Sequence, residues 1–358
     1  MRSVTLMQDI TQQLQEQIAS ALAQKTPLNI IGGDSKSWYG RTPWGQPLHV
    51  GAHQGITHYE PTELVISVRT GTSLEEIEHT LNEQHQMLPF EPSYFGPSAT
   101  IGGTVAGNLS GPRRPYSGAL RDHMLGTRLI NGKAEVMRFG GEVMKNVAGY
   151  DVSRLMCGAM GTLGVLLEVS LKVLPRPERE MTLVQEISAE QAIDSMNRWA
   201  GQSLPISATA WHDGRLYIRL SAAEQAVTAA SRSITGAVLQ EGDIFWREIR
   251  EHQLPFFNTK MPLWRLSLPP TCGSLPVKGE TLIEWGGALR WLISDTPAAD
   301  IFRAAADAGG HATLFANGDR TGQVFQPLPH GLFALHQRLR QAFDPQGIFN
   351  PGRMYEEL

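Results

Sequence analysis

Cysteine is scarce in this chain: only Cys157 and Cys272 occur among 358 residues. Two thiols are too few for a disulfide scaffold, a four-cysteine zinc site or an iron–sulfur cluster. A cluster of that kind, if one takes part, must therefore lie on another chain. Cys157 stands alone beside a predicted strand, and we expect it to be a small buried apolar residue rather than a redox thiol.

An excess of positive charge and a long hydrophobic run are also missing. The chain has 31 Lys and Arg against 35 Asp and Glu, a net charge of −4, so it has no overall basic field for nucleic acid or anionic lipid. Its most apolar stretch, 161–174, contains Glu168 and Lys172 and is shorter than the ~20 apolar residues of a membrane span. Asp9 and Glu16 interrupt the core that a signal peptide would need. We expect neither a transmembrane segment nor export by that route.

The composition is that of a globular protein, with 41% hydrophobic and 18% charged residues, and the length predicts two domains. Prolines and charges at 175–180 follow a β-rich stretch, which places a domain boundary after residue 175. Before it, the patterns predict helices at 14–22 and 73–83 and strands at 27–31, 62–69 and 163–174. Beyond it they predict antiparallel strands at 183–188, 206–220, 263–268 and 282–293, with helices at 189–200, 223–234, 301–310 and 330–342.

Glycine is concentrated between residues 96 and 164, which hold 14 of the 36 glycines. No P-loop pattern is present, and Gly158, Gly161 and Gly164 precede a strand instead of opening a helix, so they are not a Rossmann fingerprint. Glycine-bearing segments instead follow one another in a fixed order: IIGGDSK at 31, TIGGTVAGN at 100, KNVAGYD at 145 and GAMGTLGV at 158. Such segments let backbone N–H groups converge on an anion.

This order resembles the FAD-binding domain of the vanillyl-alcohol oxidase and p-cresol methylhydroxylase superfamily over roughly residues 25–175. The segments LPFEP, SGPRRPYSG, RFGGEVMKNVAGYD and FNPGRM extend the resemblance end to end to the FAD-binding subunits of bacterial glycolate oxidases. The resemblance implies an α+β fold. It consists of a two-subdomain FAD-binding domain (1–175), a smaller α+β cap domain (176–342) and a C-terminal tail (343–358) that returns to the flavin domain.

The resemblance also implies non-covalent FAD, since no histidine matches a covalent attachment position. Backbone N–H groups of two turns are expected to bind the pyrophosphate, with a point charge from Lys36: Gly32, Gly33, Asp34, Ser35 and Lys36 in the first turn, Thr100, Ile101, Gly102 and Gly103 in the second. Asp34 stands where the family usually has a third glycine. Because its carboxylate would repel phosphate, we expect it to point outward or to cap the following turn.

Further cofactor contacts are carried over from the same resemblance. Those expected around the ribityl chain and isoalloxazine are Pro89, Gly96, Asn108, Gly111, Lys145, Asn146, Gly149 and Tyr150; those expected at the adenosine end are Gly161, Thr162, Gly164 and Val165. Asn350 of the closing segment is expected to return to the flavin. Any one of these residues taken alone is more often a packing glycine or a surface polar group, so the case depends on their order.

A small carboxylate substrate normally needs an arginine fork. The candidates are Arg113, Arg114, Arg290 and Arg353, against the ordinary alternative of a salt-bridged or solvated arginine. The sequence singles out no general base.

No metal is expected. The histidines that could suggest one, His49, His53, His58 and His311, lack accompanying ligands and are interpreted as surface residues. Trp285 and Trp291 are interpreted as core or interface anchors.

The function that the resemblance implies is oxidation of glycolate to glyoxylate by a complex. Its partners would be a sibling FAD-linked subunit and an iron–sulfur subunit that receives the electrons. We expect a cytoplasmic protein that is peripheral to the inner membrane through that complex. Whether this chain or its sibling oxidises the substrate stays open. The alternatives are a structural subunit that has lost functional flavin and a self-sufficient FAD-dependent 2-hydroxy-acid dehydrogenase, such as one for D-lactate.

Overall fold

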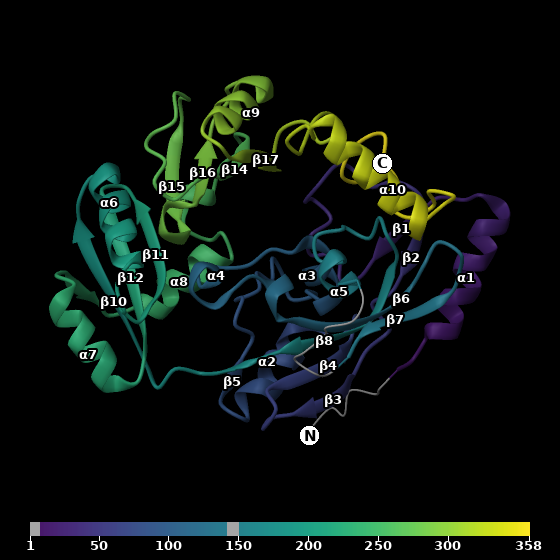
Figure 1. Cartoon of the computed structure of the whole chain (residues 1–358), viewed down its shortest axis with the longest axis horizontal. Helices are drawn as coiled ribbons and strands as arrows, with labels where there is room; N and C mark the ends of the chain where they lie inside the picture. Colours follow the sequence, from purple (N-terminus) through teal and green to yellow (C-terminus); the bar gives the residue numbers. More distant parts are fainter. Residues whose placement is uncertain (1–7, 142–149) are drawn as a thin grey trace. The chain divides into compact units, whose positions relative to one another are not determined.

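The computed structural model describes residues 8–141 and 150–358, which form two compact units (Figure 1). Unit 1 combines the described residues of Met1–Leu109, Ala119–Pro175 and Pro327–Leu358. Unit 2 combines Ser110–Gly118 and Arg176–Gln326. Helices and antiparallel sheets occur in both, which confirms the α+β class. Within the described ranges, no helix has the length and apolar character that a membrane crossing requires.

These units differ from the predicted domain ranges in two places. Residues 110–118 pack with unit 2, where the Nε1 of Trp285 donates to the carbonyl of Gly111 at 3.1 Å. Residues 327–342 were expected in the cap domain but belong to unit 1, because Arg340 donates to the carbonyls of the closing segment. A single domain boundary placed along the sequence cannot assign these two segments correctly, because each of them packs in a different unit from the residues that precede it.

The central sheet of unit 1 is antiparallel, with the strand order β3-β4-β8-β6-β7. These strands are β3 (Ile56–Glu60), β4 (Val65–Arg69), β6 (Met124–Ile130), β7 (Val136–Gly140) and β8 (Val165–Lys172). Two helices, α2 (Leu74–Asn82) and α3 (Ile101–Gly107), pack on the sheet through a core that includes Ile66, Ile77, Ile101, Val105 and Val169. As predicted, α2 begins after Ser73, whose Oγ accepts the N–H of Glu76 at 3.1 Å.

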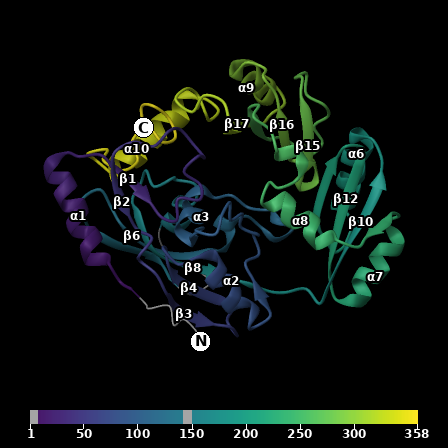
Figure 2. The same cartoon turned by 180° about the vertical axis from the view of Figure 1, so that it is seen from behind.

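A second layer of unit 1 holds the first strands and the C-terminus, as the view from behind shows (Figure 2). Here β1 (Leu28–Ile31) and β2 (Gln46–His49) pair in parallel, and α1 (Thr11–Gln24) packs against them. Their core contains Leu14, Ile18, Leu28, Leu48 and Phe349. The short elements of the unit are β5 (Gln86–Met87), η1 (Leu120–His123), α5 (Val152–Leu155) and β9 (Leu174–Pro175).

The glycine-rich segment after Thr100 forms the helix α3 instead of the expected turn. Thr100 caps this helix, because its carbonyl accepts the N–H of Thr104 at 3.1 Å and its Oγ1 accepts that of Gly103 at 3.3 Å. A Cβ at Gly102 would lie 2.7 Å from the Cβ of Thr70. This glycine therefore lets the helix approach the end of β4 closely.

Unit 2 is built on one antiparallel sheet of eight strands, with the order β13-β10-β12-β11-β15-β16-β14-β17. The strands are β10 (Arg179–Glu186), β11 (Ile206–His212), β12 (Arg215–Ala222), β13 (Ala237–Leu239), β14 (Leu263–Ser267), β15 (Glu280–Glu284), β16 (Leu289–Ile293) and β17 (His311–Ala316). The helices are α4 (Arg114–Ser117), α6 (Ala189–Ala200), α7 (Glu224–Ser233), α8 (Gly242–Arg250) and α9 (Ala298–Asp307), with the short η2 (Pro255–Phe257) and η3 (Trp285–Gly287). The antiparallel strands and the helices α6, α7 and α9 were predicted, whereas α8 and β13 were not, and β10 begins inside the predicted breaker.

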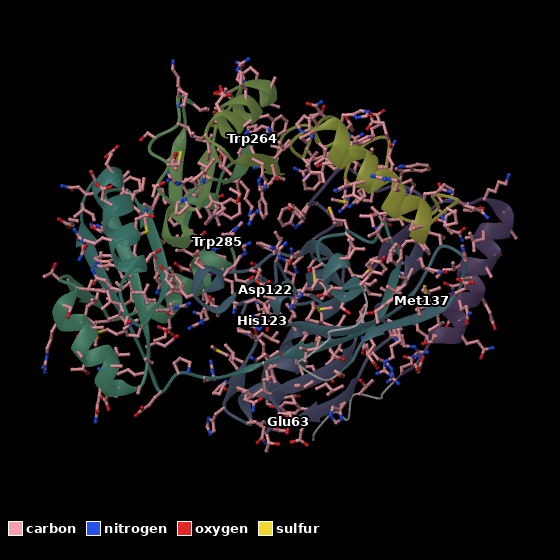
Figure 3. The ribbon with its side chains drawn as sticks, viewed as in Figure 1. Glu63, Asp122, His123, Met137, Trp264 and Trp285 are labelled. Atoms are coloured by element: carbon pink, nitrogen blue, oxygen red, sulfur yellow. The ribbon has the colours of Figure 1, made fainter. Side chains whose placement is uncertain are left out.

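The order of this sheet reveals two similar halves that meet at β11 and β15. In the first half β10 lies between β12 and β13, and in the second half β14 lies between β16 and β17, so that each half has its first strand between its third and fourth. The second strands, β11 and β15, form the junction, where Ala210 pairs with Glu284 and Trp211 with Ile283. Residues 268–279 of the second half form a coil where the first half has α6. Trp264 of β14 and Trp285, labelled in Figure 3, are both buried, as is Trp291. For Trp285 and Trp291 this burial agrees with the prediction of core or interface anchors, whereas Trp38 and Trp44 are exposed.

The closing segment of the chain is organised by one buried carboxylate. The helix α10 (His330–Phe343) ends at Asp344, which is 1% exposed and accepts the N–H groups of Ile348 at 3.1 Å and Phe349 at 2.8 Å. Burial raises the pKa of the Asp344 carboxyl. These bonds direct Phe349 into the core of unit 1.

The N-terminal end of the described chain is held by a buried histidine. His53 is 1% exposed, and its Nδ1 accepts the N–H of Ile10 at 3.2 Å. Burial lowers the pKa of His53 to about 4. Next to it, hydrogen bonding to Thr11 lowers the pKa of Asp9 to about 2, and Asp9 also pairs with Arg69 at 3.4 Å. The expectation that His53 is a surface residue is wrong.

Replacing Asp344 with Ala should lower the free energy of unfolding by about 2–4 kcal/mol, because two buried N–H groups lose their acceptor. Urea unfolding of the full chain measures this. The matched control is Asp307→Ala, which removes an exposed carboxylate at the end of α9 and should change stability by less than about 0.5 kcal/mol. Equal effects of the two changes would contradict the assigned role.

Acid should destabilise the protein through His53. Its folded-state pKa lies below the unfolded value of 6.5, so the folded state binds fewer protons and stability falls as the pH drops from 7 to 4.5, by about 2 kcal/mol from this group. In His53→Asn, which keeps an acceptor for Ile10, that drop should shrink by about this amount. His49→Asn, a change at an exposed histidine, should retain the drop. Urea unfolding at both pH values measures it.

Candidate cofactor site

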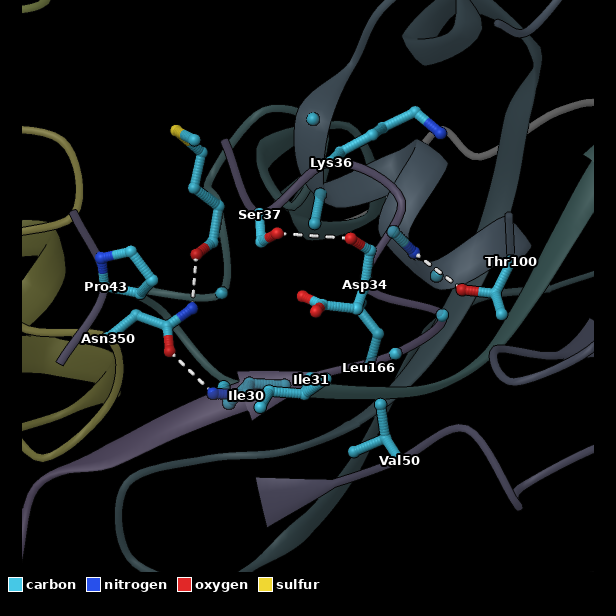
Figure 4. A pocket seen from close by; sticks show the side chains of 18 of the residues that line it. Ile30, Ile31, Asp34, Lys36, Ser37, Pro43, Val50, Thr100, Leu166 and Asn350 are labelled. Atoms are coloured by element: carbon cyan, nitrogen blue, oxygen red, sulfur yellow. Dashed lines mark hydrogen bonds between the residues drawn. The ribbon is translucent and has the colours of Figure 1, made fainter. Parts of the chain in front are cut away.

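A cavity lies beside the end of β1 in unit 1 (Figure 4). It holds about 930 Å³ of space that protein atoms do not fill, part of it open to solvent. Its walls come from β1, the loop 32–37, α3, the loop 160–164 and the closing segment. Half of the predicted cofactor residues meet here: Gly32, Gly33, Asp34, Ser35, Lys36, Thr100, Gly102, Gly103, Gly161, Gly164 and Asn350.

The first loop lies against the chain that leads into α3. Ser98 donates its hydroxyl to the carbonyl of Gly33, and a Cβ at Gly33 would overlap the carbonyl oxygen of Ser98. A Cβ at Gly32 would lie 2.9 Å from the Oγ1 of Thr100. The paired glycines are therefore required by close approach of two backbone segments, which the sequence alone did not show.

Three successive N–H groups of this loop have no acceptor in the part of the chain that the structure describes: those of Gly33, Asp34 and Ser35. The loop turns after Asp34, whose φ is 58° and whose carbonyl accepts the hydroxyl of Ser37 at 3.2 Å. Consecutive N–H groups around a left-handed residue form a concave donor surface for anions. The loop thus fits the diphosphate of a dinucleotide.

The second predicted donor segment does not supply the N–H groups expected of it. The N–H of Ile101 donates to the carbonyl of Thr72 at 3.0 Å, and that of Gly102 donates to the carbonyl of Thr70 at 2.9 Å. Their expected donation to a pyrophosphate is therefore wrong. Gly102 and Gly103 contribute side-chain-free surface to the cavity instead.

Asn350 joins three walls of the cavity. Its Oδ1 accepts the N–H of Ile30 at 2.8 Å, and its Nδ2 donates to the carbonyl of Met160 at 2.7 Å (Figure 4). A Cβ at Gly161 would lie 2.6 Å from that Nδ2, and φ at Gly161 is 73°. Asn350 returns to the cavity as expected, and the structure shows it as a positioning residue for β1 and the glycine loop.

The charged side chains of the first loop point in unexpected directions. The Nζ of Lys36 donates to the carbonyl of Tyr94 at 3.2 Å and lies 5.7 Å from the centre of the Phe95 ring. The carboxylate of Asp34 points into the cavity (Figure 4). The expectation that it points outward or caps the turn is wrong: the side chain lines the cavity, where it stays exposed to solvent.

The other predicted cofactor residues are outside the cavity lining. Asn108 nevertheless has a buried Oδ1 without a hydrogen-bond partner among the described residues, which suits an additional ligand. Tyr150 is 94% exposed, and Gly111 belongs to unit 2. The remaining residues of this group that the structure describes are Pro89, Gly96, Ile101, Thr162 and Val165. Lys145, Asn146 and Gly149 lie outside the described residues.

Each of the four candidate arginines has partners within its own unit. In unit 1, Arg353 donates to the carbonyls of Ser37, Tyr39 and Arg41. In unit 2, Arg290 donates to the carbonyls of Gly287 and Cys272, and burial lowers its pKa. These bonds argue against Arg290 and Arg353 as carboxylate ligands.

The remaining two arginines also have partners within unit 2. Arg113 pairs with Glu180, and the guanidinium of Arg114 lies 4.4 Å from the centre of the Trp285 ring. The contact of Arg114 with Trp285 is a cation–π contact.

The remaining candidates are three histidines, considered as metal ligands, and one cysteine, considered as a redox thiol. His49, His58 and His311 are exposed, and no group of three potential metal ligands occurs within residues 8–141 and 150–358. Burial raises the pKa of Cys157 to about 12, which keeps the thiol protonated. Cys157 thus behaves as the small, largely buried residue that was predicted.

Comparison with known proteins agrees with this geometry. Residues 6–140 match the FAD binding domain family. The chain is 52% identical over 350 residues to the glycolate oxidase subunit GlcE of Escherichia coli (strain K12), covering 98% of this chain and 99% of that protein. It is 33% identical over 129 residues to the glycolate oxidase subunit GlcD of Bacillus subtilis (strain 168), which covers 36% of this chain and 27% of that one.

Solved structures share the fold. The crystal structure of p-cresol methylhydroxylase with substrate bound superimposes with a TM-score of 0.73 at 15% identity, over 97% of this chain and 87% of that one. An alkyldihydroxyacetonephosphate synthase gives a TM-score of 0.67 at 13% identity, over 95% and 75%. The predicted flavoprotein fold is therefore confirmed. The chain belongs to the family of the glycolate oxidase subunit GlcE, an FAD-dependent oxidoreductase family with the p-cresol methylhydroxylase fold.

Proposed function

We propose that this chain is the FAD-binding subunit of a complex that oxidises glycolate to glyoxylate. The observation that carries the proposal is 52% identity to a glycolate oxidase subunit over almost the whole of both chains. The cavity beside β1 supports it, since the loop 32–36 presents N–H donors suited to a dinucleotide.

Within this proposal, FAD is bound without a covalent link. The N–H groups of Gly33, Asp34 and Ser35 would hold its diphosphate. Asn108, with its partnerless buried Oδ1, would accept a hydrogen bond from the cofactor. Gly161 and Gly164 leave room for the cofactor beside Asn350. Lys145, Asn146, Gly149 and Tyr150 remain predictions carried over from the resemblance.

FAD supplies the two-electron acceptor that oxidation of a 2-hydroxy acid requires. The described residues of this chain contribute binding and positioning. Because Arg113, Arg290 and Arg353 already bond carbonyl or carboxylate oxygens, they give little support to a carboxylate fork on this chain. We infer that a sibling flavin subunit performs the substrate oxidation, and that this chain passes electrons onward.

Partners and location belong to the same proposal. Two cysteines cannot ligate an iron–sulfur cluster, so the electrons would leave through a separate iron–sulfur subunit. The complex would be cytoplasmic and peripheral to the inner membrane. A self-sufficient D-lactate dehydrogenase is less well supported: the relative of that name from Anaerostipes hadrus matches 36% of this chain and 27% of its own length.

Purified alone, the full chain should carry flavin that is released as FAD on denaturation, and it should show little dye reduction with glycolate or D-lactate. Adding the sibling and iron–sulfur subunits should restore glycolate oxidation. Absorbance spectra and a dye-coupled assay measure both. Rapid turnover by the isolated chain would overturn the subunit proposal, and a colourless chain that yields no FAD would favour a structural subunit.

Replacing Gly33 with Ala should reduce the flavin content of the purified chain at least tenfold, because the new methyl group displaces the loop from Ser98. The free energy of unfolding should fall by about 1–3 kcal/mol. The control is Gly273→Ala, whose Cβ meets nothing within 4 Å. Flavin absorbance per protein and urea unfolding measure the two effects. Unchanged flavin content in Gly33→Ala would count against the loop as the cofactor site.

A further inference from the structure

Among the described residues that line the cavity, Asp34 is the only acidic one, and its carboxylate points inward (Figure 4). Within residues 8–141 and 150–358, no hydrogen bond or ion pair reaches this carboxylate. Its own backbone belongs to the donor loop, with φ of 58°. A negative side chain thus projects from the segment best suited to bind an anion.

Two cationic side chains of the described cavity wall, those of Lys36 and Arg353, donate to groups other than the carboxylate of Asp34. Lys36 donates to the carbonyl of Tyr94 and to the Oγ of Ser35, at 3.2 and 3.3 Å. Arg353 donates to three backbone carbonyls of the loop that follows, at 2.8 Å from Ser37 and 2.6 Å from Tyr39. Neither side chain forms an ion pair with Asp34, so no described cation cancels its charge by direct contact.

We propose that Asp34 sets the cofactor affinity of this chain by opposing the diphosphate that the neighbouring N–H groups attract. The proposal depends on the proposed placement of the diphosphate at residues 32–36. A carboxylate and a diphosphate repel each other, whereas an uncharged residue of the same size leaves the N–H donors unopposed. The chain therefore binds FAD more weakly, and exchanges it more readily, than its loop geometry permits.

Salt dependence distinguishes this repulsion from a steric effect. The Debye length falls from about 30 Å at 0.01 M salt to about 3 Å at 1 M. Repulsion between Asp34 and the diphosphate therefore weakens as salt is added. A steric obstruction or a lost hydrogen bond would not follow this dependence.

The decisive comparison uses the full chain, freed of flavin, and its Asp34→Asn variant. Asparagine has the same size and tolerates the left-handed backbone, so only the charge changes. At about 0.02 M salt the variant should bind FAD about tenfold more tightly, and the ratio should shrink to twofold or less at about 0.5 M. Flavin fluorescence titration and calorimetry measure the dissociation constants.

Fragments of the cofactor identify the group that Asp34 opposes. ADP, which carries the diphosphate, should show a gain in affinity similar to that of FAD. Riboflavin, which carries no phosphate, should show none. The matched control is Asp213→Asn, because Asp213 is exposed in the β11–β12 hairpin of unit 2 with φ of 47°. This control should leave all three affinities unchanged.

Equal or weaker FAD binding by Asp34→Asn would overturn the inference. Equal binding would mean that the charge of Asp34 does not act on the cofactor, and weaker binding would mean that the carboxylate makes a favourable contact with it. An equal gain for riboflavin would also overturn it, because the effect would not act through the diphosphate. These results leave the proposed function intact. If neither protein binds FAD or ADP while circular dichroism shows both folded, the proposed cofactor site fails and the inference fails with it.

Discussion

The cofactor cavity depends above all on the side-chain amide of Asn350. It accepts a hydrogen bond from the first strand and donates one to the loop around Met160, so that residues 30, 160 and 350 are held together. Asp344 prepares this contact by turning the chain after α10, and Phe349 anchors it in the core. Because the walls come from segments that are distant in sequence, loss of one of these contacts would loosen the whole cavity.

The electrostatics of the site are unusual for one that accommodates a diphosphate. The groups suited to attract a diphosphate are uncharged backbone N–H donors, because the side chains of Lys36 and Arg353 both donate hydrogen bonds to backbone carbonyls. Preorganised N–H groups solvate an anion without a basic surface, which suits a chain of net charge −4. Asp34 works against that arrangement from within the same loop.

Unit 2 is one sheet of two similar halves, and its buried arginines have partners inside the unit. Its two halves share a strand order, but a coil replaces a helix in the second. Arg113 and Arg290 support the unit itself through Glu180 and the carbonyls of Gly287 and Cys272. Polar groups buried in this way stabilise a fold and contribute little to recognition of a small acid.

The sequence by itself determined the α+β class, α2 with its Ser73 cap, α6 and α7, because these follow from periodicity and capping. Half of the residues predicted as cofactor contacts line one cavity. Only the tertiary structure decided that α3 replaces a turn and that the N–H groups of Ile101 and Gly102 donate to backbone carbonyls of the protein. It also decided that His53 is buried and that the side chain of Asp34 points into the cavity. Each of these depends on a partner far along the chain, such as Thr70, Thr72 or Ser98, and local pattern carries no information about which distant backbone will be adjacent.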